Sequence, residues 1–249
     1  ALNEPGLVPI ALADFERGDA ALLAAKEERS FVEYFFTCSP SLPLYVLNHF
    51  AEVEIVTYLD ADLLFFSSPE PLFEELGDGS ISIIGHRFPD YNRDLEKFGI
   101  YNVSWLSFRR DANGLACLQW WRERCLESCS DEEKDGKFAD QKYLDDWPER
   151  FEGVVVLRHK GADLAPWNWM NEPIDLAAEP ISIGGQPLVF FHYQGLKVFN
   201  SWLYDPVTLG HNYGEMPLPL RRRLYRPYIE ALKVASAHLR TVDPSIALV

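Results

Sequence analysis

The sequence predicts an α/β fold with a mixed, mostly parallel central sheet and flanking helices. Two observations support this prediction. Short apolar stretches rich in β-branched residues alternate along the chain with longer stretches of helical character, as strands and helices do in an α/β sheet. The chain also has 249 residues, of which 47% are hydrophobic and 24% charged, so it can bury the sizeable core that such a fold needs.

The N-terminal part predicts one strand and two helices before a second strand. Residues 6–15 (GLVPIALADF) are expected to form a strand followed by a loop. Residues 19–36 are rich in helix formers, and residues 39–50 begin a second helix with Ser-Pro chemistry. The stretch VEIVTYL at 53–59 has the length and the β-branching of a buried strand.

The middle of the chain continues the alternation. Two further strands are expected at 80–86 (SISIIGH) and 101–110 (YNVSWLSFRR). A helix is expected over 113–129, because its apolar side chains share one helical stripe: Leu115, Leu118, Trp121 and Cys125.

The next segment adds a short helix and more strands. Residues 138–151 predict an amphipathic helix that ends at Pro148, and residues 153–159 (GVVVLRH) predict a strand. The segment 180–195 has the pattern of a hairpin or of paired strands, interrupted by a Gly-Gly pair.

The net charge of the chain limits the kinds of molecule that it is expected to bind. The formal net charge is −15, and such a field repels phosphate backbones, so nucleic acid is excluded as an expected partner. Residues 218–240 reverse this balance, with six Lys or Arg and a single Glu. They predict a basic helix that is either solvated or in peripheral contact with an anionic membrane surface.

The cysteines and the hydropathy pattern point to a cytoplasmic location. Cys125 and Cys129 are four residues apart, but no second pair at ligand spacing and no nearby His completes a zinc site, so buried thiols in a reducing compartment are expected. No stretch has the form of a signal peptide or approaches the ~20 apolar residues of a membrane span.

Two carboxylates follow the strand predicted at 53–59. Asp60 and Asp62 are alternate residues, so at a strand-to-loop junction both can reach one ion. Ligands of α/β sheets bind outside the carboxyl ends of strands, where these residues lie. Hard divalent cations take a few carboxylates and leave positions for phosphate oxygens of a substrate. A lone Asp-x-Asp is weak evidence, but its place after a buried strand strengthens it.

Four motifs in order then resemble one known family. They are YLDADLLFFSSPEPLF (58–73), YNVSWLSF (101–108), ADQKYLDDW (139–147) and FFHYQGLK (190–197). Together they resemble the retaining glycosyltransferases of family 8, the glycogenin-like and lipopolysaccharide galactosyltransferase-like enzymes with the GT-A fold. Four ordered motifs are more specific than any one of them.

The resemblance implies a metal-bound nucleotide-sugar site. Asp60, Asp62 and His192 would hold Mn²⁺ or Mg²⁺ on the diphosphate of a UDP-sugar, and two oxygens with one imidazole nitrogen suit either ion. Asn102 would lie near the donor sugar. Asp140 and Gln141 would lie beside the anomeric carbon, where a carboxylate or amide can stabilise a positively charged sugar.

Other candidate site residues follow from the same resemblance or from side-chain chemistry. Gly195 and Lys197 would approach the diphosphate, although they are two residues apart where the family motif has three, and VFN follows where the family has Pro-Trp. Thr37 is a candidate donor contact or a plain turn hydroxyl. A sugar acceptor could stack on aromatic rings and bind an amide at Trp167, Asn168 and Trp169, or these could close the core.

The resemblance covers roughly residues 20–200. It assigns residues 1–200 to a GT-A domain that begins at the family's second strand, and residues 201–249 to a helical, basic C-terminal extension. The expected function is metal-dependent transfer of a hexose from a nucleotide sugar, with retention, to a glycan, lipid or protein acceptor.

Two alternatives stay open at this point. The first is a non-catalytic relative that binds nucleotide sugars or glycans. The second is a phosphatase-like hydrolase, because haloacid dehalogenase-type enzymes also place Asp-x-Asp at a strand end. Those enzymes have Thr or Val two residues after the second Asp, where this chain has Leu64.

Overall fold

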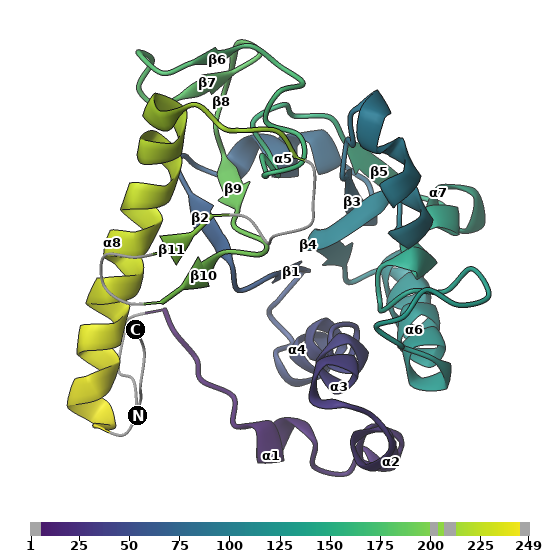
Figure 1. Ribbon diagram of the computed structural model, residues 1–249. Helices are drawn as coiled ribbons and strands as arrows, with labels where there is room; N and C mark the ends of the chain where they lie inside the picture. Colours follow the sequence, from purple (N-terminus) through teal and green to yellow (C-terminus); the bar gives the residue numbers. More distant parts are fainter. Residues whose placement is uncertain (1–5, 200–203, 207–212, 245–249) are drawn as a thin grey trace.

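The computed structural model describes residues 6–199, 204–206 and 213–244. Figure 1 shows a central sheet with helices beneath it and one long C-terminal helix along its side. The α-helices and 3-10 helices (η) are α1 (Leu12–Phe15), α2 (Ala20–Glu28), α3 (Phe31–Cys38), α4 (Ser41–His49), α5 (Glu70–Leu76), η1 (Asp90–Phe98), α6 (Ala112–Glu127), η2 (Lys142–Asp146), α7 (Trp147–Arg150) and α8 (Leu218–Val242).

The strands of the described residues form one central sheet and three small ones. The central sheet has the order β1-β4-β3-β5, and β2 pairs with β9 in a separate ribbon. The strands are β1 (Ile55–Leu59), β2 (Leu63–Phe65), β3 (Ile81–Gly85), β4 (Tyr101–Arg109), β5 (Val154–Leu157), β6 (Ile174–Asp175), β7 (Ser182–Ile183), β8 (Gln186–Pro187), β9 (Phe190–His192), β10 (Lys197–Val198) and β11 (Tyr204–Asp205).

The mixed sheet with flanking helices is confirmed, but the prediction that it is mostly parallel is wrong for the described strands. β4 runs antiparallel to both of its neighbours, β1 and β3, and within the central sheet only β3 and β5 are parallel. The reason is that residues 86–100 return the chain beside β3 in the opposite direction. A short apolar segment indicates that a strand is buried, but it does not indicate whether the strand is parallel or antiparallel to its neighbours.

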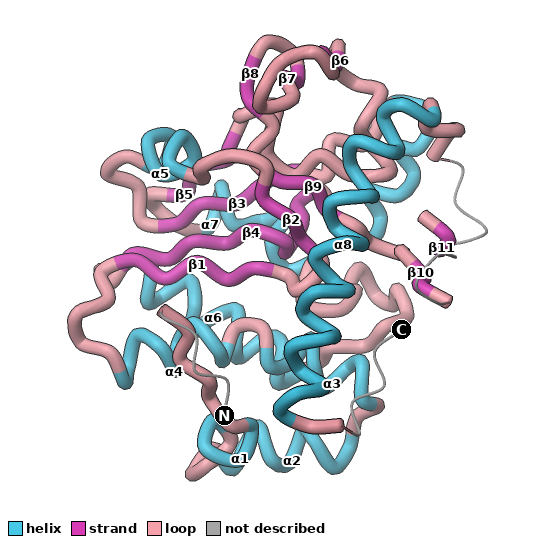
Figure 2. The backbone as a smooth tube through the Cα atoms, turned by 90° about the vertical axis from the view of Figure 1, so that its left-hand side faces the viewer, coloured by secondary structure: helices cyan, strands magenta, loops and turns pink. Residues whose placement is uncertain are grey.

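The central sheet is buried on two faces. On one face, Leu106 and Phe108 of β4 pack against α6 through Leu118 and Trp121, in a cluster that Leu47 of α4 also joins. Figure 2 shows α4 and α6 along this side of the sheet. The other face packs against the β2–β9 ribbon, where Trp105 stacks on Phe190 with ring centroids 5.9 Å apart. The ribbon is therefore fixed to the central sheet by core packing.

The helix predicted over 218–240 is present as α8, and it is part of the fold's second core. Its Leu224 and Tyr225 are buried against Phe191 and Tyr193 of the β9 segment. No helix among the described residues is both long and apolar enough to cross a lipid bilayer. The predicted domain boundary at residue 200 lies outside the described residues.

Several local predictions hold and others do not. The strands expected at 53–59, 80–86, 101–110 and 153–159 and the helices at 39–50 and 113–129 are confirmed. Within 180–195, β7 and β8 form the expected hairpin, and their turn is made by Gly184 and Gly185, both with positive φ, which glycine adopts without strain.

Three helix and strand predictions at the N-terminus and around Pro148 were wrong. Residues 6–15 contain no strand but a loop and the short α1. The helix expected over 19–36 is two helices, because Ser30 and Glu33 form a capping box that starts α3 anew. Pro148 lies in the first turn of α7, where its missing N–H costs no hydrogen bond, so it does not end a helix.

Candidate functional site

Two ladders of strand pairing bring the predicted metal ligands together. In the first ladder, Leu59 at the end of β1 pairs with Trp105 of β4, and the next residue, Asp60, donates its N–H to the Ser104 carbonyl at 3.3 Å. In the second ladder, Leu63 of β2 pairs with His192 of β9. The turn at residues 61–62 connects them, so the register of each ladder fixes one side of the site.

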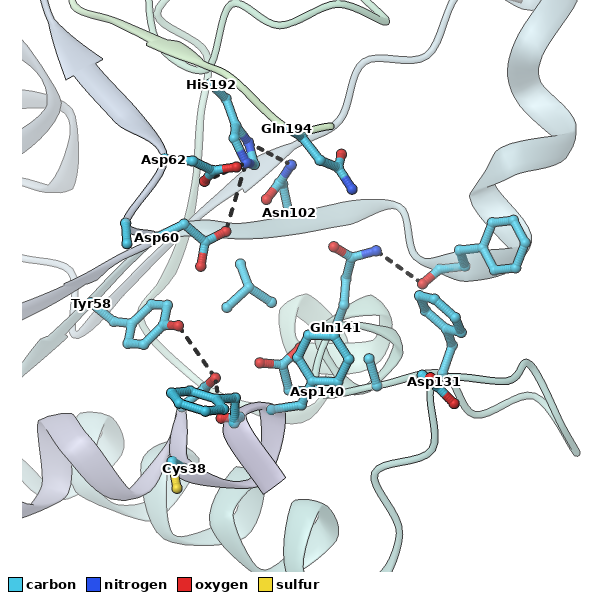
Figure 3. Close-up of a pocket in the computed structure, with 18 of the residues that line it drawn as sticks. Cys38, Tyr58, Asp60, Asp62, Asn102, Asp131, Asp140, Gln141, His192 and Gln194 are labelled. Atoms are coloured by element: carbon cyan, nitrogen blue, oxygen red, sulfur yellow. Dashed lines mark hydrogen bonds and ion pairs between the residues drawn. The ribbon is translucent and has the colours of Figure 1, made fainter. Parts of the chain in front are cut away.

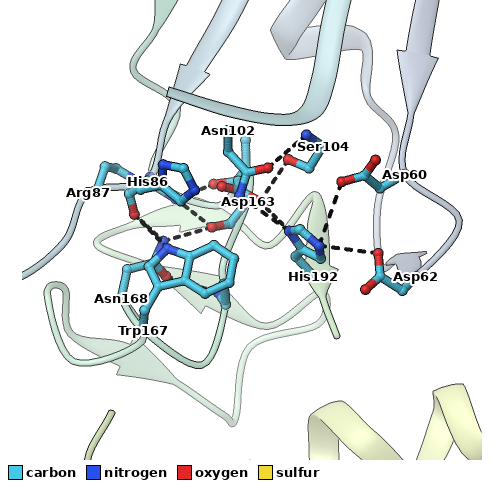
Figure 4. Close-up of polar contacts among 12 residues, drawn as sticks. Asp60, Asp62, His86, Arg87, Asn102, Ser104, Asp163, Trp167, Asn168 and His192 are labelled. Carbon is cyan, nitrogen blue, oxygen red and sulfur yellow. Dashed lines mark hydrogen bonds and ion pairs between the residues drawn. The ribbon is translucent and has the colours of Figure 1, made fainter. Parts of the chain in front are cut away.

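The three side chains converge on one point (Figure 4). Nε2 of His192 lies 3.2 Å from Oδ1 of Asp62 and 3.9 Å from Oδ2 of Asp60, and one ligand atom from each of the three residues lies within 4.8 Å of the other two. Ligands that bind one Mg²⁺ at 2.0–2.1 Å stand no more than about 4.2 Å apart. The two measured separations meet this condition, so the residues present fit a divalent cation.

The pKa values of the three groups describe a site that favours positive charge. Burial raises the pKa of Asp60 to about 6, while the adjacent His192 opposes the shift. Burial has the same tendency at Asp62, but the hydrogen bond from His192 lowers its pKa below the usual value. Burial would lower the pKa of His192, yet its hydrogen bonds to Asp163 and Asp62 raise it to about 10. A bound cation would replace this proton, since metal binding and protonation compete for the same groups.

A cavity of about 1360 Å³ opens in front of these ligands (Figure 3). Asn102, Asp140, Gln141 and Gly195 line it together with the metal-ligand candidates. Its outer part is apolar and aromatic, with contributions from Phe31, Phe35, Phe88, Phe98 and Phe138. The cavity therefore joins a polar floor to an aromatic rim, the combination that small-molecule sites use for orientation and for burial.

The side chains of the predicted catalytic pair lie on the cavity wall. Burial raises the pKa of the Asp140 carboxyl to about 7, a hydrogen bond with Ser39 opposes the shift, and the charge of Asp60 adds to it. The Asp140 carbonyl accepts the indole N–H of Trp121 at 2.8 Å, which anchors this segment to α6. Gln141 is half-buried and donates from Nε2 to the Phe98 carbonyl at 3.1 Å.

Asn102 lies at the start of β4, between the two ladders. It is 3% exposed, its Oδ1 accepts the Ser104 N–H at 2.8 Å, and its Nδ2 lies 3.5 Å from Nδ1 of His192. The structure thus places the predicted donor residue against a predicted metal ligand.

Of the three predicted acceptor residues, only Trp167 lines the cavity. Its ring meets that of His192 edge to face at 5.3 Å, and its indole N–H donates to the His86 carbonyl. The amide of Asn168 is used internally, with Nδ2 donating to two carbonyls and Oδ1 accepting from Ala165. Trp169 packs in the core cluster of α8. The positions of Asn168 and Trp169 therefore favour the alternative that they close the core.

Two predicted donor contacts also lie away from the cavity. Thr37 is fully buried in α3, where its hydroxyl donates to the Glu33 carbonyl at 2.7 Å and accepts from Arg29. Lys197 is exposed on β10, whose partner strand is β11. Neither residue is among those that line the cavity.

Sequence reasoning missed two residues behind the site, the buried Asp163 and the half-buried Arg87. Asp163 is 0% exposed and lies 3.4 Å, Oδ1 to Nδ1, from His192. The guanidinium of Arg87 donates to the backbone of the segment that carries Asp163. No sequence signal marks either residue, because each lies in a loop without periodicity and its partners are distant in the chain.

The fold and the site define the class: an α/β protein whose strand ends present two carboxylates and an imidazole that could hold a cation, inside a large cavity. No protein-family model matches the chain. It is 34% identical to the uncharacterized protein YfnF of Bacillus subtilis (strain 168) over 251 residues, which span 98% of this chain and 80% of YfnF. It is 30% identical to the uncharacterized protein YfnD of the same organism over 244 residues, spanning 93% of this chain and 75% of YfnD. The chain belongs to the family of these two proteins.

Among solved structures, the chain is similar to a glycosyltransferase involved in the glycosylation of the major capsid of PBCV-1. The two share 12% sequence identity with a TM-score of 0.46, and the match covers 67% of this chain and 73% of the viral one.

Proposed function

We propose that this protein is a metal-dependent glycosyltransferase that moves a hexose from a nucleotide sugar, UDP-linked, to an acceptor with retention. The observation that carries the proposal is the convergence of Asp60, Asp62 and His192 in a cavity that also holds Asn102 and Asp140. The order of motifs that resembles family 8 supports the same reading.

Charge balance explains why such a protein needs a cation. A nucleoside diphosphate is an anion, and the chain has a formal net charge of −15, to which the two carboxylates of the cavity floor, Asp60 and Asp62, contribute. Asp60, Asp62 and His192 would hold Mn²⁺ or Mg²⁺. A bound divalent ion would supply positive charge that stabilises the leaving diphosphate. The carboxylates therefore serve an anionic ligand only through an ion between them.

The residues on the cavity wall have roles that follow from their chemistry. Cleavage of a glycosidic bond passes through a sugar with oxocarbenium character, which a nearby carboxylate stabilises. In this proposal Asp140 serves that role, because its carboxyl is buried, where electrostatic interactions are stronger than in water. Gln141 orients the sugar through its amide, and the rings of Trp167 and of the rim exclude water and offer faces on which a sugar can stack.

The first test is calorimetric titration of UDP with and without Mn²⁺. We expect binding that requires Mn²⁺, because the cavity floor offers anions rather than cations to a diphosphate. Equal affinity in both conditions would refute the metal site. A second measurement, release of UDP from UDP-hexoses without an acceptor, separates a transferase from a non-catalytic relative, since a working site hydrolyses its donor slowly. Metal-dependent UDP binding with no hydrolysis of any UDP-hexose, and no transfer to any acceptor offered, would favour the non-catalytic alternative.

A further inference from the structure

His192 has a third carboxylate neighbour, Asp163, on the side of its ring that faces away from the cavity floor. Nε2 of this ring faces Asp60 and Asp62, whereas Nδ1 faces Asp163 at 3.4 Å (Figure 4). Oδ1 of Asp163 also accepts the hydroxyl of Ser104 at 3.0 Å. Asp163 is thus held by β4 on one side and meets the ring from behind.

The neighbours of Nδ1 decide which nitrogen of His192 is free to bind a cation. A neutral imidazole carries one N–H, so Nε2 can bind a metal only when the proton is on Nδ1. Asn102 does not accept that proton, because the atom that it presents to Nδ1, at 3.5 Å, is the donor Nδ2, while its Oδ1 accepts the Ser104 N–H. Of these two neighbours, Asp163 alone is an acceptor, and a charged one.

The backbone around Asp163 is fixed by contacts that its own side chain does not make. Arg87 donates to four carbonyls of the preceding loop: His159, Lys160, Ala162 and Asp163. Asn168 donates to the Asp163 carbonyl at 2.9 Å. The His192 N–H donates to the Leu164 carbonyl at 2.8 Å, which joins the loop to β9. These contacts join the loop that carries Asp163 to the strand that carries His192.

Two features of Asp163 are unfavourable for stability and call for another explanation. Its φ is +51°, in the left-handed region where residues other than glycine are strained. Its Oδ2 is buried and has no hydrogen-bond partner among the described residues, a costly arrangement for a carboxylate. Strain and unpaired buried atoms persist where the surrounding structure imposes them, and they concentrate at functional sites.

We infer that Asp163 is a positioning residue that accepts the Nδ1 proton of His192, and so fixes the ring with Nε2 available to the cation. This rests on the proposed metal site, and it adds an outer carboxylate to the three residues of that site. Carboxylate–histidine–metal arrangements orient the ring, and loss of such an outer partner typically weakens metal binding by 10–100-fold.

The test measures Mn²⁺ alone, by electron paramagnetic resonance of the full chain. Titration gives the affinity, and pulsed measurements detect the magnetic coupling between bound Mn²⁺ and the nitrogen of His192. We expect Asp163→Asn, which keeps the size of the side chain, to weaken Mn²⁺ binding about ten-fold. Asp163→Ala should weaken it more and remove the nitrogen coupling, because Asn102 then faces Nδ1 alone.

A matched control separates positioning from stability. Asp111→Asn alters another structural carboxylate, which caps α6 through the Gly114 N–H and accepts the Ser80 hydroxyl, away from the cavity. It should lower the melting temperature but leave Mn²⁺ affinity and nitrogen coupling unchanged. Wild-type affinity and coupling in both Asp163 variants would overturn the inference while leaving the proposed metal site intact. Failure of the unaltered protein to bind Mn²⁺ would instead overturn the metal site, and the inference with it.

Discussion

The molecule carries two concentrations of charge, one acidic and one basic, that differ in how their charges are arranged. The acidic floor, formed by Asp60 and Asp62, converges on a buried histidine at the end of a cavity. The basic face of α8 contains Arg222, Arg223 and Arg226, which are exposed and spread along one helix. Charges that converge on one point in a cavity define a ligand by its size and coordination, whereas charges exposed on a helix surface produce a graded attraction that salt screens. The first has the geometry of a ligand site, and the second is a charged surface.

The largest effect is expected from a substitution in the acidic floor. Asp62→Asn removes one negative charge and a candidate ligand at 3.2 Å from His192. We expect Mn²⁺-dependent UDP binding to fall below detection in calorimetry. The control is Asp94→Asn, which makes the same change at an exposed position of η1. Unchanged Mn²⁺-dependent affinity in the Asp62 variant would show that the acidic floor is no more a site than the basic face.

A smaller effect is expected at Asp140, which lines the cavity but is not a candidate metal ligand. Asp140→Asn keeps the shape of a buried side chain but removes its charge. If Asp140 stabilises the reacting sugar, kcat for UDP-hexose turnover should fall by about 10²–10³, the range found when one preorganised electrostatic group is removed. Calorimetric UDP affinity with Mn²⁺ should stay within about three-fold, by the same differential-binding argument. A variant with wild-type kcat would assign Asp140 to packing.

The smallest effect belongs to the basic face, which we propose contacts anionic lipid peripherally. Arg222→Gln with Arg226→Gln removes two charges, worth about 1 kcal/mol each near an anionic surface, or about thirty-fold together at low salt. Sedimentation with phosphatidylserine vesicles measures this loss, which should vanish at high salt. Arg17→Gln with Arg93→Gln makes the same change in net charge at exposed positions elsewhere. Equal vesicle binding by both double variants would make α8 a solvated helix.

Substitution is preferable to truncation for this last test. Removal of α8 after Pro217 would also remove the buried Leu220, Leu224 and Tyr225, and so expose the core that they share with Phe191. Loss of vesicle binding in such a variant would report unfolding as readily as loss of charge.

The correct predictions concern segments whose local sequence pattern determines their local structure. β1 was predictable because its residues are apolar and β-branched, and the carboxylates that follow it lie at the strand end as expected. The direction of β4 was not, since an apolar strand reads the same in a parallel or an antiparallel pair. His192 was placed by resemblance to a family motif, and its register opposite Leu63 then explains its position physically.

The remaining site residues were hidden for a different reason. Asp163 contacts Ser104 and His192, which are 59 and 29 positions away in the chain, so no spacing rule connects them. For Asn168 the sequence left open a contact with a ligand or a place in the core, because a sequence shows that a side chain has hydrogen-bonding groups but not whether the backbone already uses them.

Only one residue, Ala61, separates Asp60 from Asp62, and this short spacing affects how the two sheets unfold. Asp60 follows the β1–β4 ladder and Asp62 precedes the β2–β9 ladder, so Ala61 is the junction between two sheets that are hydrogen-bonded separately and meet through core packing. An ion bound by both carboxylates would link the central sheet to the β2–β9 ribbon. Unfolding of the ribbon and α8 would then be coupled to unfolding of the central sheet, and amide hydrogen exchange in β9 would slow with rising metal concentration, as linkage between binding and opening requires.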